Sequence, residues 1–260
     1  MTGTICRVEY NDYVGTNIKR MGISGIKPEG EVLPGQFLHI KPCADHHGLI
    51  LRRPISISDV HPSTGIMDII YLIKGPGTFE LSKLKAGDGV DALGPLGNGL
   101  SLDKSVKNLL LIGGGMGVAP LLYAARYYKN LSVSGIFGWR DAGSTFPLGD
   151  AAGFMDRVYI CTEDGSKGHR GLVTDIFSER LVDIRPDMVF ACGPTAMLKA
   201  IQRLCARFGL ASRFSIEEKM GCGVGSCMTC ACKIGRTDDW QYKRVCCEGP
   251  VFDGQRVVLD

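Results

Sequence analysis

Hydrophobic and polar residues alternate in short segments through residues 1 to about 100. Segments 36–40, 54–58 and 67–73 show this alternation, and Gly or Pro residues separate them. A period of two is typical of half-buried strands, and frequent turn residues favour an all-β barrel or sandwich. We therefore predict an antiparallel β-barrel here, with one short helix near 78–85, where apolar residues fall at helical spacing.

From residue 103 to about 217 the pattern changes to continuous apolar runs that alternate with helical periodicity. Strands buried on both faces and separated by helices indicate βαβ units around a parallel sheet, which binds its ligands at the carboxyl ends of the strands. The predicted strands are 108–112, 133–137, 157–161, 188–192 and 213–216, and the predicted helices are one around 121–125, one at 171–181 and one at 195–208.

Residues 218–260 are rich in Cys and Gly and show little periodicity. This composition suits a small domain folded around a metal centre. We predict a multidomain α+β protein with a β-barrel domain at 1–101, a Rossmann-like α/β domain at 102–217 and a small C-terminal domain at 218–260. A chain of 260 residues is long enough for such units.

Composition narrows the function classes. A hydrophobic content of 45% and a net charge of +3 indicate a globular protein and do not favour nucleic acid as a partner. No apolar run reaches about 18 residues, so no membrane-spanning helix is expected. The N-terminus lacks a signal-peptide pattern. Since many of the eleven cysteines cluster at one end, we expect metal ligation in a reducing cytoplasm rather than disulfides.

Cys222, Cys227 and Cys230 follow the spacing C-x4-C-x2-C, and Cys246 comes fifteen intervening residues later. This is the spacing of plant-type [2Fe–2S] loops, and the alternating glycines around it permit tight wrapping. A structural zinc site with four cysteines is the alternative, but zinc ribbons more often carry two C-x2-C pairs. Free thiols are a third interpretation.

Two further cysteines leave choices open. Cys247 adjoins Cys246, and spacing alone does not say which of them is the fourth ligand. Cys232 follows Cys230 by two residues and is interpreted as a small buried side chain.

Gly113, Gly115, Gly117 and Pro120 form a strand–turn–helix junction with the pattern G-x-G-x-x-P over its last three members. Small residues and a helix N-terminus suit a pyrophosphate, although glycines at such a turn also serve helix–strand packing.

Cys192, Gly193 and Pro194 end a predicted strand, so they are candidates for the nicotinamide site. The thiol of Cys192 faces either a nicotinamide ring or the protein core. Arg140 and Asp141 follow another strand, where an acid suggests NAD and an arginine suggests NADP. Local chemistry leaves that choice open.

Arg53 and Ser56 place a guanidinium and a hydroxyl on a predicted strand, where they suit a phosphate and a flavin edge. Gly75, Gly77 and Thr78 provide a second glycine turn at the start of a predicted helix, which also suits a phosphate. For the strand that carries Arg53 and Ser56, the alternative interpretation is an edge strand whose arginines are solvated.

The order of these motifs resembles ferredoxin–NADP reductase-like flavoproteins, and within them the electron-transfer subunit of B-type dihydroorotate dehydrogenase. The motifs are R-P-x-S, G-x-G-T, G-P-L-G-N-G, G-G-G-x-G-V-x-P, C-G-P, the cysteine run and V-C-x-x-G-P-V-F. The resemblance covers nearly the whole chain. Its most specific parts are 33–37, 52–56, 94–99 and the cysteine run.

The resemblance implies FAD, a [2Fe–2S] cluster and NAD as cofactors. It implies FAD contacts from Arg53, Pro54, Ile55, Ser56, Ile70, Tyr71, Leu72, Gly77 and Thr78. It implies Cys222, Cys227, Cys230 and Cys246 as the cluster ligands, because the first cysteine of 246–247 matches the family's V-C-x-x-G-P.

The resemblance also implies a role in pyrimidine biosynthesis. A partner catalytic subunit with FMN would oxidise dihydroorotate, and electrons would pass through the cluster and FAD to NAD⁺. The complex would be a heterotetramer with two copies of each subunit. The flavin exchanges electrons in pairs and singly. No acid–base pair is evident in the chain, so we assign no catalytic residue and no role to its histidines. Two alternatives are an NAD(P)H:ferredoxin-type reductase subunit with another partner, and a zinc-stabilised binding protein.

Overall fold

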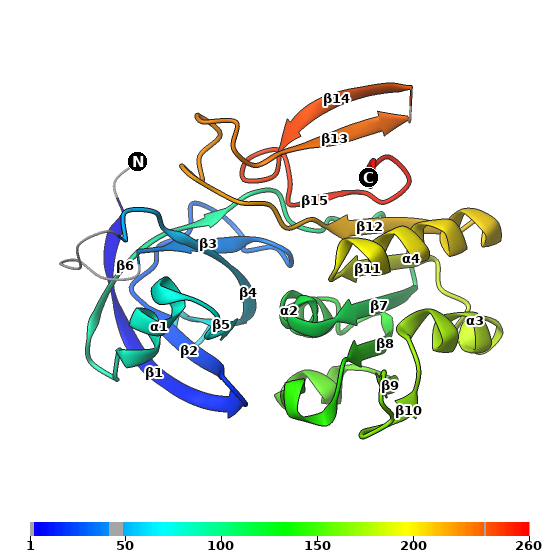
Figure 1. The fold of residues 1–260 in the computed structure, drawn as a ribbon, viewed down its shortest axis with the longest axis horizontal. Coiled ribbons are helices and arrows are strands. Elements are labelled where there is room, and N and C mark those ends of the chain that lie inside the picture. The colour runs from blue at the N-terminus through cyan, green and yellow to red at the C-terminus, as the bar shows by residue number, and fades with distance from the viewer. Residues whose placement is uncertain (1–2, 42–48, 237, 260) are drawn as a thin grey trace.

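The computed structural model describes residues 3–41, 49–236 and 238–259. A closed antiparallel barrel forms one side of the molecule and a layered sheet with helices forms the other (Figure 1). The barrel strands lie in the order β1-β2-β5-β4-β3-β6. They are β1 (Thr4–Gly15), β2 (Ile18–Ser24), β3 (Phe37–Ile40), β4 (Arg53–His61), β5 (Ile66–Leu72) and β6 (Gly89–Leu96). The predicted barrel is confirmed.

The barrel closes around apolar side chains that alternate along its strands. Val8, Met21, Leu38, Ile57 and Ile69 are fully buried in this core. The helix α1 (Pro76–Lys83) follows β5 and begins two residues before its predicted start, because proline at its first position fits a helix N-terminus. In β3, alternation turns the neighbours of Leu38 to the outside of the barrel, where other parts of the chain cover them.

The second unit is a seven-stranded sheet in the order β10-β9-β8-β7-β11-β12-β15. All neighbouring strands are parallel except β12 and β15. The strands are β7 (Asn108–Gly114), β8 (Ser132–Trp139), β9 (Arg157–Thr162), β10 (His169–Arg170), β11 (Met188–Cys192), β12 (Ala211–Ser215) and β15 (Val251–Asp253). The predicted parallel sheet is therefore confirmed, and the central β7 is buried along all but its first residue.

Helices cover both faces of this sheet. The helix α2 (Ala119–Tyr127) packs on one face together with the 3₁₀ segment η3 (Gly149–Phe154). The helices α3 (Val173–Ile184) and α4 (Thr195–Phe208) pack on the other. Two shorter 3₁₀ segments are η1 (Gly115–Val118), directly before α2, and η2 (Ala142–Ser144).

The C-terminal segment contains a hairpin of β13 (Ala231–Arg236) and β14 (Asp239–Arg244) above the sheet (Figure 1). Its last strand, β15, leaves the hairpin region and pairs with β12, with Phe252 opposite Phe214. The segment is therefore joined to the seven-stranded sheet by backbone hydrogen bonds. Within the described residues, no helix has both the length and the apolarity that crossing a bilayer requires.

The loop after β6 fastens the barrel to the C-terminal segment. The backbone N–H of Asn98 donates to the carbonyl of Gly249 at 2.5 Å, and the Asn98 side chain donates to the carbonyls of Cys247 and Glu248. A Cβ at Gly97 would lie 2.6 Å from the Gly249 carbonyl oxygen, and φ at Gly97 is +78°. Glycine is therefore required here for both the turn and the close approach.

Candidate functional site

A cavity of about 470 Å³ lies between the barrel strands β4 and β5 and the sheet. Residues of the glycine-rich junction, Met116 and Ala119, form another part of its wall. Seven of the predicted flavin residues line it, namely Pro54, Ile55, Ser56, Ile70, Tyr71, Leu72 and Thr78. The mixture of apolar walls and a few hydroxyl groups suits a planar heteroaromatic ring such as a flavin.

Arg53 and Gly77, the other two predicted flavin residues, lie in contact beside this cavity. A Cβ at Gly77 would lie 2.3 Å from the Arg53 Nε, so only glycine lets the guanidinium rest against the first turn of α1. Lys74 lines the cavity nearby. Two cations and the positive end of a helix would attract the phosphates of FAD, so these residues fit that cofactor.

Tyr71 and Ile55 border the cavity but direct their side chains into the barrel core. The buried Tyr71 hydroxyl donates to Asn11 Oδ1 at 2.8 Å, and burial raises the pKa of that phenol. What these two residues offer the cavity is therefore backbone. The motifs indicate these positions, but they do not distinguish side-chain contacts from backbone contacts.

A second cavity, of about 800 Å³, opens at the carboxyl ends of β7, β8, β9 and β11. Gly115 and Met116 form one wall, Trp139 and Arg140 another, and Pro194 and Met197 a third. This is the position at which parallel sheets of this kind bind nucleotides, and its size suits a dinucleotide. We call it the nucleotide cleft.

The three predicted glycines of the junction have different tasks. A Cβ at Gly113 would lie 2.8 Å from Val118, and one at Gly117 would lie 2.3 Å from the Cys192 carbonyl oxygen. Gly113 and Gly117 therefore permit close packing of the strands and helix. Gly115 has φ of +56° and open space beside it, and it alone of the three lines the nucleotide cleft.

Cys192 does not line the cleft. Its thiol is fully buried, and this burial raises its pKa far above the ordinary range. The alternative of a buried strand cysteine therefore describes the structure, in which the thiol lies near the Ser215 hydroxyl. Gly193 lines a neighbouring cavity, and Pro194 lines both that cavity and the cleft.

The charged side chains at the wall formed by Trp139 and Arg140 are already paired with other groups of the protein. Arg140 Nε lies 2.8 Å from Asp141 Oδ2, and the Ser144 backbone N–H donates to Asp141 Oδ1 at 2.8 Å. These contacts lower the pKa of Asp141. Because Glu163 also lines the cleft, the wall carries two carboxylates and one neutralised guanidinium. Such a wall favours a free ribose hydroxyl over a 2′-phosphate.

The thiols of the cysteine loop, residues 222–230, and the thiol of Cys246 form two pairs. The side chains of Cys222 and Cys227 lie within hydrogen-bonding reach of each other, and so do those of Cys230 and Cys246. A [2Fe–2S] cluster needs two thiolates on each iron. Among the described residues, no three cysteine sulfurs lie within 4.8 Å of one another, as ligands of one zinc ion would. The paired arrangement fits the cluster better than zinc.

Backbone N–H groups of the loop point at these sulfurs. The N–H groups of Ser226 and Val224 donate to Cys222 Sγ at 3.2 and 3.5 Å, and that of Gly225 donates to Cys246 Sγ at 3.1 Å. Hydrogen bonds from Thr229 lower the pKa of Cys227 to about 6. Donors aimed at sulfur stabilise thiolates, which are the ligand form.

Cys246 and Cys247 differ sharply in position. Cys246 is buried beside Cys230, and the pKa of Cys246 is raised to about 12, first by burial and then by the Cys230 side chain. A bound metal cation would stabilise the thiolate forms of Cys230 and Cys246 at this buried position. Cys247 is half-buried behind the loop, where a Cβ at Gly225 would lie 2.6 Å from its Sγ.

A charged clamp holds the loop to the turn that carries Cys246. Arg244 donates to the Gly225 carbonyl at 2.8 Å, and its Nε lies 2.9 Å from Glu248 Oε2. Lys243 pairs with the other carboxylate oxygen at 2.9 Å. The Arg244 backbone N–H and these two cations hold the pKa of Glu248 at about 2.

Cys232 lies away from the paired thiols. It is buried in β13 and lines a third cavity, of about 610 Å³, between the hairpin, the start of α4 and the glycine-rich junction. Burial raises the pKa of this thiol to about 12. It is therefore a neutral thiol, as its interpretation as a small buried side chain predicts.

Glu217 lines both this third cavity and the first cavity, which lies between the barrel and the sheet and which we call the flavin-type cavity. Its side chain borders the open space of the two cavities. Burial against the cavity walls raises the pKa of its carboxyl group. No role was predicted for Glu217 from the sequence. The signal available was its position directly after the last parallel strand, where ligand-facing residues gather.

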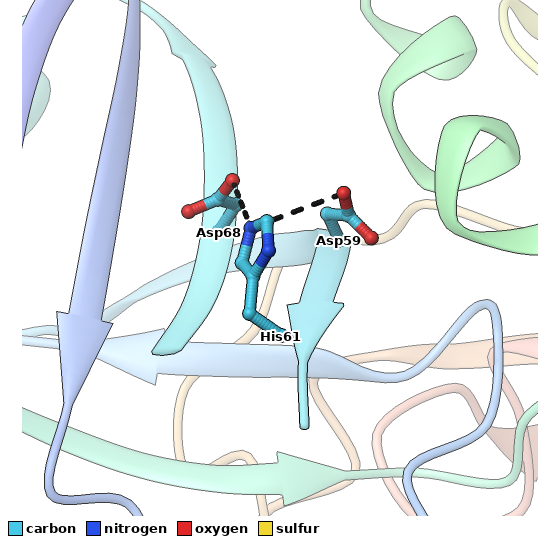
Figure 2. Close-up of side chains that lie close together, drawn as sticks. All are labelled: Asp59, His61 and Asp68. Atoms are coloured by element: carbon cyan, nitrogen blue, oxygen red, sulfur yellow. Dashed lines mark hydrogen bonds and ion pairs between the residues drawn. The ribbon is translucent and has the colours of Figure 1, made fainter. Parts of the chain in front are cut away.

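Asp59, His61 and Asp68 come close together on β4 and β5 (Figure 2). His61 Nε2 lies 3.1 Å from Asp68 Oδ2 and 3.9 Å from Asp59 Oδ2. Asp68 is also bound by Arg20 and by the Tyr10 hydroxyl, and Asp59 lies 2.8 Å from Arg126 of α2. The carboxylates are thus neutralised by arginines, so we interpret the group as an ion-pair network that joins the barrel to α2.

Comparisons with known proteins agree with this geometry. Residues 217–258 match the family model described as the iron–sulfur cluster binding domain of dihydroorotate dehydrogenase B. The chain is 38% identical over 250 residues to the dihydroorotate dehydrogenase B (NAD(+)) electron transfer subunit of Geobacillus sp. (strain WCH70), covering 95% of each chain. It is 37% identical over 257 residues to the protein of the same name from Bacillus velezensis, covering 97% of each.

Solved structures share the fold. A structure of the NADH-dependent reduced ferredoxin-NADP oxidoreductase matches with a TM-score of 0.85 and 30% identity, covering all of this chain and 92% of the other. A ferredoxin NADP⁺ reductase from Neisseria gonorrhoeae with bound FAD and NADP matches with a TM-score of 0.65 and 16% identity, covering 80% and 92%. The latter likeness concerns the fold alone.

Proposed function

The chain belongs to the family of dihydroorotate dehydrogenase B (NAD(+)) electron transfer subunits, and from that premise we propose how its residues serve electron transfer. It is an oxidoreductase subunit that uses FAD, a [2Fe–2S] cluster and NAD, and it works with a catalytic partner subunit. The resemblance seen in the sequence motifs is confirmed at the level of the family.

One observation carries the proposal: the flavin-type cavity touches both of the other sites. It shares Met116 and Leu72 with the nucleotide cleft, and it includes Met220 and Pro250 from the segment that bears the cysteines. A carrier in this cavity would therefore lie between a dinucleotide and a cluster. When bound, FAD supplies the exchange of electrons in pairs with NAD and singly with an iron–sulfur centre.

We assign the residues to the cofactors as follows. Arg53, Gly77 and Thr78 bind the phosphates of FAD, while Pro54, Ser56, Ile70, Leu72 and the backbone of Ile55 and Tyr71 border its ring. Gly115 and Pro194 border the dinucleotide, and Gly113, Gly117, Cys192 and Gly193 shape that site from behind. Cys222, Cys227, Cys230 and Cys246 bind the cluster, with Cys246 preferred over Cys247 because of its pairing with Cys230.

The partner carries FMN and oxidises dihydroorotate to orotate, and the assembly contains two copies of each subunit. Electrons leave the partner, enter this chain at its cysteine loop and reach NAD⁺ at the nucleotide cleft. The loop suits entry because Cys227 and Met228 are exposed at its surface. The cytoplasm is the proposed compartment, since cysteine ligands would be at risk of forming disulfides in an oxidising one.

Co-expression with the FMN-dependent catalytic subunit tests this proposal. We expect the two chains to co-purify, and we expect dihydroorotate-dependent NAD⁺ reduction only when both are present. The chain alone should bind FAD and iron and reduce dyes with NADH. Turnover of dihydroorotate by this chain alone, or a colourless protein that contains zinc, would contradict the proposal.

An NAD(P)H:ferredoxin-type reductase subunit is the second candidate. One observation favours this second candidate. The likeness to the NADH-dependent reduced ferredoxin-NADP oxidoreductase structure extends over the whole chain. Pull-down from the native host separates the two: recovery of a different redox enzyme in place of the dihydroorotate-oxidising subunit supports this second role.

A further inference from the structure

His39 is a buried histidine whose ring has no hydrogen-bond partner. Its exposed fraction is 0%, and neither Nδ1 nor Nε2 makes a hydrogen bond. In either protonation state the imidazole carries at least one N–H donor. A buried donor without an acceptor costs free energy, so such a group signals an acceptor that the polypeptide does not supply.

The ring lies against the cysteine loop. A Cβ at Gly223, the residue after Cys222, would lie 2.3 Å from His39 Nδ1. Gly223 has φ of +73° and is buried, so glycine serves both the turn and the space that the ring occupies. The backbone carbonyl oxygens of Arg52 and Cys222 lie near the ring, but neither is in hydrogen-bonding geometry with a ring nitrogen.

The strand β3 directs this ring toward the cysteines and away from the barrel core. Its neighbours Leu38 and Ile40 point into the barrel, whereas Phe37 belongs to the core cluster that also contains Cys230 and Cys246, and it lines the flavin-type cavity. Phe37 and His39 share one face of the strand, with ring centroids 6.5 Å apart in an edge-to-face arrangement. His39 therefore occupies the boundary between the barrel and the loop that begins at Cys222.

We propose that an N–H of His39 donates a hydrogen bond to sulfur of the bound cluster on its Cys222 side, which makes His39 a positioning residue that tunes the cluster's reduction potential. This inference rests on the proposed cluster. A reduced cluster carries one more negative charge than an oxidised one, so a donor stabilises the reduced form more. Hydrogen bonds to the sulfurs are a known determinant of cluster potentials.

The test uses the purified full chain reduced with dithionite. First, iron analysis and the visible spectrum establish that the wild-type chain holds the cluster, because its absence would refute the proposed function and not this inference. Pulsed EPR of protein labelled with ¹⁵N-histidine then reports whether an imidazole nitrogen couples to the reduced cluster. We expect a coupling that disappears in His39→Leu and persists in His169→Leu, a change at an exposed histidine of β10.

Redox titration gives a second, independent measurement. In His39→Leu the cluster potential should become more negative, so that the ratio of reduced to oxidised cluster at a fixed potential falls about two- to tenfold, as loss of one net hydrogen bond allows. His39→Gln, which keeps an N–H donor, should recover part of the change. A cluster-bearing wild-type chain without histidine coupling, or an unchanged potential in a folded His39→Leu chain, would overturn the inference.

Discussion

The backbone N–H of Gly225 donates to Cys246 Sγ at 3.1 Å, although 21 residues separate the two in the chain. This contact brings the Cys246 sulfur to the loop, and it supports our proposal of Cys246 over Cys247 as the fourth ligand. Cys246→Ser should therefore lose nearly all visible cluster absorbance and bound iron, and Cys222→Ser should do the same, with FAD retained in both. Cys247→Ser is the matched control and should keep the cluster; the reverse pattern would exchange the two assignments.

Arg53→Ala should weaken FAD binding about 10- to 100-fold, because it removes a charge-assisted contact to phosphate. The iron content should stay unchanged, since the guanidinium lies at α1 and not at the cysteine loop. Flavin fluorescence titration and the ratio of FAD to iron after gel filtration measure this. Arg7→Ala removes a barrel arginine whose side chain is 69% exposed, and it should leave FAD affinity as in the wild type. Equal losses in both variants would argue against the phosphate contact.

Asp141→Asn should raise the use of NADPH relative to NADH about three- to fivefold, because it removes a carboxylate and frees Arg140 for a 2′-phosphate. The amide oxygen can still accept from the Ser144 backbone, so the turn should survive. The ratio of kcat/KM values in a dye-reduction assay reports the change. Asp164→Asn changes a nearby acid that bonds Ser166 and lies outside the cleft lining, so its ratio should not move. An unchanged ratio in Asp141→Asn would place the ribose elsewhere.

Asp68→Asn should destabilise the protein by about 2–4 kcal/mol, because it leaves Arg20 and His61 facing an uncharged group inside the barrel wall. Asp68 is fully buried, and its carboxylate binds Arg20, His61 and Tyr10. The denaturant midpoint of the cofactor-bound protein measures the loss. Asp12→Asn, at an exposed position of β1, should fall within about 0.5 kcal/mol of the wild type. A similarly small effect of Asp68→Asn would show that the network contributes little.

Glu217→Gln should make the protein more heat-stable at pH 7, with the advantage disappearing near pH 4. The walls of the cavity raise the pKa of Glu217, so the folded chain holds this proton more tightly than the unfolded chain does. For such an acid, stability is highest below the ordinary pKa of about 4.3 and falls as pH rises through the raised folded value. Glutamine avoids that loss. Thermal unfolding of both proteins from pH 4 to pH 8 tests this, and a constant difference across that range would contradict it.

Local patterns predicted the sheet unit well. The strand β11 and the helix α4 have the bounds that the periodicity predicts, because an apolar strand and an amphipathic helix are specified by neighbouring residues. The hairpin of β13 and β14 was not predicted. Its strands are short and half-exposed and carry charged residues such as Lys233 and Lys243, so no clean alternation marks them.

The candidate site was predictable where it depends on spacing and not where it depends on distant contacts. The spacing of Cys222, Cys227 and Cys230 predicts a tight loop, whereas spacing alone leaves Cys246 and Cys247 as alternatives and the choice of Cys246 came from the resemblance. No role was predicted for His39, because nothing in the sequence relates it to Gly223, which lies far along the chain. For Cys192 the sequence left two interpretations open, a ligand-facing thiol and a core thiol. The structure buries this thiol, and Gly117 packs against the Cys192 carbonyl.

The pairing of β15 with β12 determines what kind of carrier this protein is. Because the chain returns from the cysteine segment to the sheet edge at Phe252, and the turn at Gly249 is bound by Asn98 of the barrel, the redox-active loop is braced at two points. A domain that moves on a flexible linker would deliver electrons at a rate that depends on the viscosity of the solvent. Here the separation between donor and acceptor is built into the fold, so internal transfer should be insensitive to the viscosity of the medium.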